Sequence, residues 1–240
     1  MRKCLLFVPL AAMLLASTRL CAVELNPTER IWLLAAQPVI AFARAQALPL
    51  DIVVQPQATP GETPMGMAYV AGRCKLVLSM RGNPDAQATL DSIGQGLIGP
   101  VVEAIAAHEL GHCWRHVQQD WGTLPAAVRE PSALNRVTQE QADVLRDMWR
   151  TRREEGYADL VGLAWTLAHH PDRYAQVHAW HVHLRADQPL DTGPHDTRVW
   201  VNLAKDSRRF TATGSIFEQV EPLWLAGLLD GSVNALYAAE

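Results

Sequence analysis

The sequence predicts an α+β fold, with a small N-terminal sheet followed by a mostly helical C-terminal part. Two observations support this expectation. Short runs rich in β-branched and apolar residues all precede residue 81, whereas long helical patterns dominate after residue 100. Strands and helices in separate blocks, rather than in alternation, are typical of α+β proteins. The chain of 240 residues, 49% of them hydrophobic and 19% charged, is long enough for one globular domain.

The first 22 residues have the pattern of an export signal. Arg2 and Lys3 precede an apolar run, Cys4 to Ala16, whose length is typical of a signal peptide. We expect cleavage after Ala22, and an uncleaved anchor is the alternative. Residues 23–240 then form a single domain that is periplasmic or secreted. No later run approaches 18 unbroken apolar residues, so we expect no membrane span once the signal is removed.

Charge and cysteine content limit the expected partners. The formal net charge is −4 and no block of basic residues occurs, so nucleic acid is not an expected partner. Removal of residues 1–22 leaves two cysteines, Cys74 and Cys113. In an oxidising compartment a disulfide between them would tie a strand to a helix. Two unpaired, buried cysteines are the alternative.

The N-terminal half contains the expected strands and two helices. Asn26 or Thr28 can cap a helix that continues to about Ala47, and Pro38 would break or kink it. A short helix starts at Pro84. The expected strands are Leu50 to Val54, Met67 to Ala71 and Cys74 to Met80, and the last two form a hairpin around Gly72-Arg73.

The rest of the chain is expected to consist of helices joined by loops. Ser132 can cap one of them. The helical stretches cover residues 101–118, 135–149, 150–169, 171–186, 195–208, 214–229 and 232–239, and the second and third could be one continuous helix.

The first of these helices carries a pattern suited to metal binding. Its residues His108-Glu109-Leu110-Gly111-His112 read H-E-x-x-H. A helix advances about 100° per residue, so the two histidines project from one face, one turn apart, as needed to grip one Zn²⁺ ion. Glu109 lies beside them, where its carboxylate can act as a general base on a water molecule.

A chance match on a solvated helix face is the alternative to metal binding. The residues before the motif are mostly apolar, so this helix belongs to the core and its ionisable groups need partners. Gly111 costs about 1 kcal/mol in a helix interior, which indicates that another segment approaches the backbone closely. Both features favour the metal site.

A catalytic zinc site needs a third protein ligand. A histidine six residues after His112 is ruled out, because that residue is Gln118. Glu155 is the predicted ligand, since Asp159 follows it by one helical turn and can accept the N–H of a ligand histidine. Glu154 and Glu140 are lesser candidates. An acidic first helical turn without a metal is the structural alternative.

These residues resemble the gluzincins, zinc metallopeptidases that combine H-E-x-x-H with a downstream glutamate. The spelling of His108–His112 and of Glu154–Asp159 is most similar to the heat-shock membrane peptidases and CAAX-processing peptidases. The resemblance covers only these two segments. It implies a zincin-like fold, a Zn²⁺ cofactor and hydrolysis of a peptide or protein substrate. Members of that group usually carry membrane spans, whereas this chain shows only a signal.

The sequence therefore predicts an exported zinc endopeptidase in which Glu109 is the general base. His195, at a helix entrance, is the candidate that stabilises the oxyanion, and a surface-loop histidine or a helix cap is the alternative. Tyr157 is the second candidate, and simple packing is its alternative. The strand Cys74 to Met80 is the candidate for pairing with a substrate backbone. His116 is expected to be structural or to face solvent. A second group of histidines receives no role: His169, His170, His178, His181 and His183.

Two other functions fit the same residues. One is a non-catalytic zinc-binding protein that serves partner binding or quality control. Intact Glu109 argues against it, because ligation alone does not need that carboxylate. The other is a zinc hydrolase of a non-peptide amide or ester.

Overall fold

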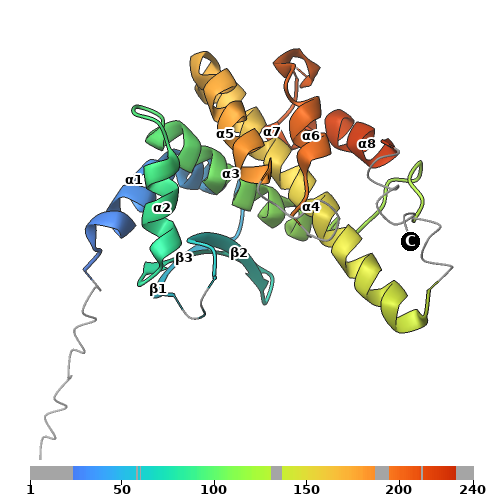
Figure 1. Ribbon diagram of the computed structural model, residues 1–240, viewed down its shortest axis with the longest axis horizontal. Coiled ribbons are helices and arrows are strands. Elements are labelled where there is room, and N and C mark those ends of the chain that lie inside the picture. The colour runs from blue at the N-terminus through green and yellow to red at the C-terminus, as the bar shows by residue number, and fades with distance from the viewer. Residues whose placement is uncertain are drawn as a thin grey trace, which may run out of the picture.

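The computed structural model describes residues 24–57, 59, 61–130, 137–186, 195–211 and 213–230. It has a small sheet near the N-terminus followed by helices, which confirms the α+β class (Figure 1). The signal at residues 1–22, the Ser132 cap and the helix at 232–239 lie outside the described residues. Within the described residues, no helix is both long enough and apolar enough to span a membrane.

Helix α1 (Pro27–Ala45) begins at a capping box. The Asn26 side chain accepts the backbone N–H of Glu29 at 2.8 Å, and the Glu29 carboxylate accepts that of Asn26 at 2.7 Å, so Asn26 is the cap and Thr28 lies within the helix. The helix continues through Pro38, so the expected break is wrong, and the kink stays a prediction. Pro38 lies on the exposed face of the helix. Its ring has no N–H to donate to the carbonyl one turn earlier, and on this face water can donate to that carbonyl instead.

The sheet consists of β1 (Leu50–Pro56), β2 (Met65–Val70) and β3 (Arg73–Arg81) in the order β1-β3-β2. Strand β3 pairs in parallel with β1 and antiparallel with β2. The predicted hairpin is present, but its turn is Ala71-Gly72 rather than Gly72-Arg73, because Arg73 already pairs with Val70. Both turn residues have positive φ, 51° and 77°, as a two-residue hairpin of this kind requires.

Helix α2 (Pro84–Ser92) is short, and α3 (Ile98–Val117) is the element around which the others pack. Helix α3 contacts α1, α4, α5, β2 and β3. The disulfide Cys74–Cys113 joins it to β3, as the sequence suggested. The sheet and helices α4 and α5 therefore share α3 as a common neighbour, with the sheet below it in the view of Figure 1.

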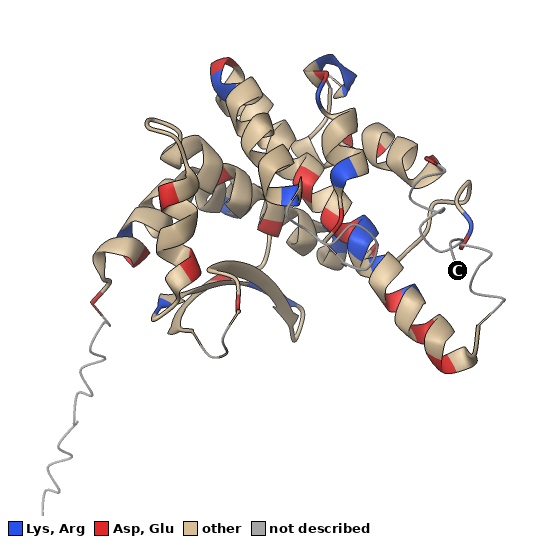
Figure 2. Ribbon diagram, viewed as in Figure 1, with Lys and Arg blue, Asp and Glu red and all other residues tan. Residues whose placement is uncertain are grey.

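Helix α4 (Gln139–His169) is a single helix of 31 residues where two had been considered. It begins later than residue 135, because Thr138 and Gln141 form a capping box. Its first turns project away from the body, and charged residues, most of them red, lie along them in Figure 2. Asp143–Arg146 and Asp147–Arg150 are ion pairs one turn apart that stabilise this exposed part.

Small residues let α3 and α4 pack closely. A Cβ added at Gly111 would lie 3.1 Å from the Ala158 Cα, and one at Gly162 would lie 2.6 Å from the carbonyl oxygen of Ala104. The close approach inferred from Gly111 is thus confirmed, and the approaching segment is α4. This packing fixes the distance between the H-E-x-x-H helix and the helix that carries Glu155.

The remaining helices are α5 (Tyr174–Ala186), α6 (Arg198–Leu203), α7 (Ile216–Gln219) and α8 (Glu221–Leu229), with 3₁₀ turns at Pro171–Arg173 and Ser207–Arg209. The expected helix at 195–208 is shorter, because the Asp206 side chain caps the separate 3₁₀ turn. The expected helix at 214–229 is two helices. Pro222 occupies the first turn of α8, where a missing N–H is tolerated.

Candidate metal centre

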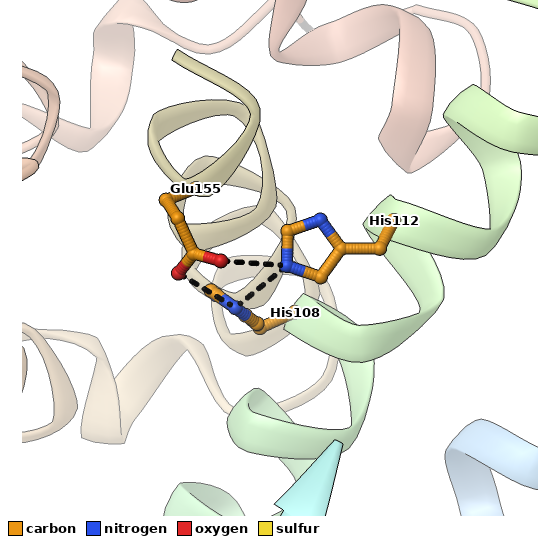
Figure 3. A group of neighbouring side chains, drawn as sticks. All are labelled: His108, His112 and Glu155. Carbon is orange, nitrogen blue, oxygen red and sulfur yellow. Dashed lines mark hydrogen bonds and ion pairs between the residues drawn. The ribbon is translucent and has the colours of Figure 1, made fainter. Parts of the chain in front are cut away.

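Three predicted ligands meet at the crossing of α3 and α4. His108 and His112 project from α3 and Glu155 projects from α4 toward them (Figure 3). The ligand atoms all lie within 4.8 Å of one another, and this largely buried group could hold a metal ion. The helical spacing of the histidines and the close packing at Gly111 together produce this convergence.

The distances within the group can be compared with those around a tetrahedral ion. The two Nε2 atoms are 3.1 Å apart, and Glu155 oxygens lie 3.2 Å from His112 Nε2 and 3.5 Å from His108 Nε2. Ligand atoms at about 2.0–2.2 Å from a tetrahedral ion are separated by about 3.3–3.6 Å. The 3.2 Å contact is made by Glu155 Oε1 and the 3.5 Å contact by Oε2, so the carboxylate and the two Nε2 atoms are spaced much like three ligands around one such ion.

Asp159 fixes the orientation of His108. Its Oδ1 accepts a hydrogen bond from His108 Nδ1 at 2.9 Å, as the spacing from Glu155 predicted. A proton on Nδ1 leaves the lone pair of Nε2 for a metal. Arg185 donates to both oxygens of Asp159, at 2.8 and 2.6 Å, and Thr197 Oγ1 donates as well. The sequence reasoning missed Arg185 and Thr197.

His112 is held by packing. Its Nδ1 is enclosed and has no hydrogen-bond partner among the described residues. The ring meets Trp121 edge-on, with ring centroids 5.5 Å apart. Trp121 also stacks on His116, which stacks on Tyr69. His116 is thus part of an aromatic stack.

Glu109 lies beside the ligands without belonging to them. It is 8% exposed and lines the same cavity as the three ligand residues. It receives no hydrogen bond from the described residues. Burial raises the pKa of its carboxyl, and the charges of His108 and His112 offset only part of this rise. A carboxylate that binds protons more readily is better suited to act as a general base near neutral pH.

The lesser ligand candidates are placed elsewhere. The Glu154 carboxylate is fully buried and accepts two hydrogen bonds from Arg115, at 2.9 and 3.2 Å, and one from the Gly122 N–H at 3.0 Å. Glu154, which precedes Glu155 in the acidic motif, therefore has a structural role in an ion pair with Arg115. Glu140 is exposed in the first turn of α4.

The two candidate oxyanion donors, His195 and Tyr157, lie in different surroundings. His195 borders the cleft and its Nδ1 lies 3.0 Å from Glu155 Oε2, with 47% of its side chain exposed. Tyr157 points the other way, and its hydroxyl donates to the carbonyl of Phe217 at 3.0 Å. Tyr157 does not line the cleft, and its contacts are those of a packing residue.

A cleft of about 490 Å³ opens over the metal group. Apart from that group its lining is largely apolar, with side chains of Trp32, Met65, Met67, Ile105, Trp180 and Leu184. It also touches the consecutive residues Thr63 to Met67. Side chains of a strand alternate between its two faces, so a cleft that touches consecutive residues borders the edge of β2.

Comparisons with protein family models, with curated proteins and with solved structures found no match. The chain is therefore an α+β protein with a buried His-His-Glu group that could hold a metal ion. The resemblance to gluzincins rests on the two sequence motifs alone.

We expect zinc binding to release protons. Burial opposes the charge on His108, but hydrogen bonds to Asp159 and Glu155 outweigh it and raise the pKa of His108 to about 10 in the metal-free protein. Metal and proton compete for Nε2, so about one proton should leave at pH 7, and affinity should rise about tenfold per pH unit. Calorimetry in buffers of different ionisation enthalpy measures the release. Binding without release would contradict the assigned ligand.

Proposed function

We propose that this chain is an exported zinc-dependent endopeptidase. The observation that carries the proposal is Glu109, an unliganded carboxylate on the open side of a three-ligand group that fits a catalytic rather than a closed site. Structural zinc sites use four protein ligands and need no acid beside them. The Cys74–Cys113 disulfide supports export, because such bonds persist in oxidising compartments.

Bound zinc would polarise the scissile carbonyl and lower the pKa of a coordinated water to about 7. The residues of this chain supply the other steps. Glu109 accepts the proton of the attacking water and delivers it to the leaving amine. Asp159, held by Arg185, keeps the proton of His108 on Nδ1. His195 holds Glu155 in position, and its predicted role as an oxyanion donor remains part of this proposal.

The edge of β2 supports a polypeptide substrate. The Ser79 N–H donates to the Pro64 carbonyl at 2.9 Å, so these two residues form a hydrogen-bonded pair. Such pairs alternate along an antiparallel ladder, which places the backbone groups of Met65 and Met67 on the side away from β3. Both residues line the cleft, so an extended peptide could pair with this edge.

The strand first considered for this role is unsuitable. Cys74 to Met80 belongs to β3, which has β1 on one side and β2 on the other. A central strand has no free backbone groups to offer to a substrate. We therefore assign substrate pairing to β2.

The proposal is tested by metal reconstitution of the mature protein. Protein stripped by a chelator should not cleave an unfolded casein, and one equivalent of Zn²⁺ should restore cleavage. Glu155→Gln should lose zinc affinity by more than the roughly 10–100-fold typical of a residue that merely supports a ligand. Glu140→Gln, on the exposed end of the same helix, is the matched control and should bind zinc normally.

Two outcomes separate the alternatives. Tight zinc binding without cleavage of any unfolded protein would favour a non-catalytic zinc-binding protein. Cleavage of small amide or ester substrates but not of polypeptides would favour a non-peptide hydrolase. If the protein binds no zinc, the result contradicts the peptidase, the non-catalytic zinc-binding protein and the non-peptide hydrolase alike.

A further inference from the structure

Helix α5 contributes one wall of the cleft, and one of its polar side chains is not used by the metal group. His178, His181 and Arg185 are buried along α5. His178 Nε2 lies 2.8 Å from the Val201 carbonyl and is structural. Arg185 is bound to Asp159. His181 borders the cleft and is only 2% exposed.

The contacts of His181 determine which of its nitrogens carries the proton. Nδ1 lies 3.1 Å from the carbonyl oxygen of Val177, one turn earlier on α5. A carbonyl can only accept, so Nδ1 donates and carries the proton. This is the one hydrogen bond that the described residues give the ring, and it leaves Nε2 without a protein donor. In the neutral ring Nε2 is therefore a hydrogen-bond acceptor available to a molecule in the cleft.

The surroundings keep this ring neutral. Burial lowers the pKa of His181 to about 4; the charge of Asp159 opposes this effect, and Arg185 and His108 reinforce it. Near neutral pH, Nε2 therefore presents a lone pair to the cleft rather than a second N–H. Because His181 lines the cleft, a molecule bound there can donate a hydrogen bond to this lone pair.

An extended peptide has a donor in the right direction. Paired with the edge of β2, it would turn the N–H and C=O groups of alternate residues away from that strand. Strand β2 and α5 both line the cleft, and both contact α3. In Figure 1 the sheet lies below α3 and α5 lies above it. Because α5 lines the same cleft as β2, an N–H turned away from β2 can reach the wall that holds His181.

We propose that His181 is a substrate-positioning residue, whose Nε2 accepts a hydrogen bond from a backbone N–H of the bound peptide. The inference rests on the proposed peptidase function and adds a second, side-chain contact to the pairing with β2. This contact would restrict substrates to chains with a backbone N–H at one defined position near the scissile bond.

The test compares His181→Gln with His181→Phe. Glutamine can place its amide oxygen near the position of Nε2, whereas phenylalanine fills the space without an acceptor. We expect His181→Phe to raise KM about tenfold or more with little change in kcat, because a substrate N–H is left unpaired. His181→Gln should restore most of the affinity. Zinc content and melting temperature of both variants identify a folding defect, and His181→Leu replaces His181→Phe if that variant does not fold.

Peptides with one backbone amide replaced by an ester give an independent readout. At one position near the cut, the ester should raise KM for the wild type about as much as His181→Phe does, and should cost that variant nothing further. An unchanged KM in His181→Phe, or equal ester penalties in both proteins at every position, would overturn the inference alone. A zinc-loaded wild type that cleaves no peptide would overturn the proposed function first.

Discussion

Glu109→Gln should abolish cleavage while leaving the metal in place. The substitution keeps the shape of the side chain but removes the base that takes the proton of water. Loss of a positioned general base lowers kcat by about 10²–10⁴-fold. Zinc binding should not weaken, because the ligand atoms belong to His108, His112 and Glu155. The measurement is kcat on an unfolded casein, with zinc content determined on the same samples.

Glu103→Gln is the matched control for that variant. Glu103 is also a buried glutamate of α3, 7% exposed, but it accepts hydrogen bonds from Trp165 at 2.9 Å and from His170 at 3.0 Å, away from the cleft. Its loss should lower stability and leave kcat nearly unchanged. Substantial cleavage by Glu109→Gln would remove the observation on which the peptidase proposal rests.

The metal group could be predicted from sequence because its geometry is mostly local. His108 and His112 are placed by helical periodicity alone. Glu155 was identified through Asp159, one turn further on the same helix, and the contact of Asp159 with His108 is present at 2.9 Å. The only non-local requirement was that the two helices touch, and Gly111 gave a sign of it.

Features that depend on strand order or side-chain direction could not be predicted in this way. The hairpin was found from its turn, but nothing in the sequence shows that β1 pairs with β3 and leaves β2 at the edge beside the cleft. Tyr157 adjoins the acidic motif in sequence, yet its hydroxyl faces Phe217. Arg185 lies 26 residues after Asp159, a separation at which no periodicity connects the two.

Removal of the disulfide should produce the largest loss of stability. Replacement of Cys74 and Cys113 by alanine opens a loop whose ends are 39 residues apart in sequence. Loop-closure entropy predicts a loss of about 4 kcal/mol in the free energy of unfolding. Unfolding by urea, followed by fluorescence of the eight tryptophans, measures the change. Wild type unfolded in the presence of a thiol reductant should approach the curve of the double variant, and the reductant should not affect that variant.

The same substitution should also weaken the metal site, because Cys113 directly follows His112 and anchors α3 to β3. Zinc stabilises only the folded protein, so excess Zn²⁺ should recover part of the lost stability in proportion to the logarithm of its concentration. Glu155→Gln in the double-alanine background should abolish that recovery. If removal of the disulfide left stability unchanged, the bridge would not constrain the unfolded chain, and its support for an oxidising location would be lost.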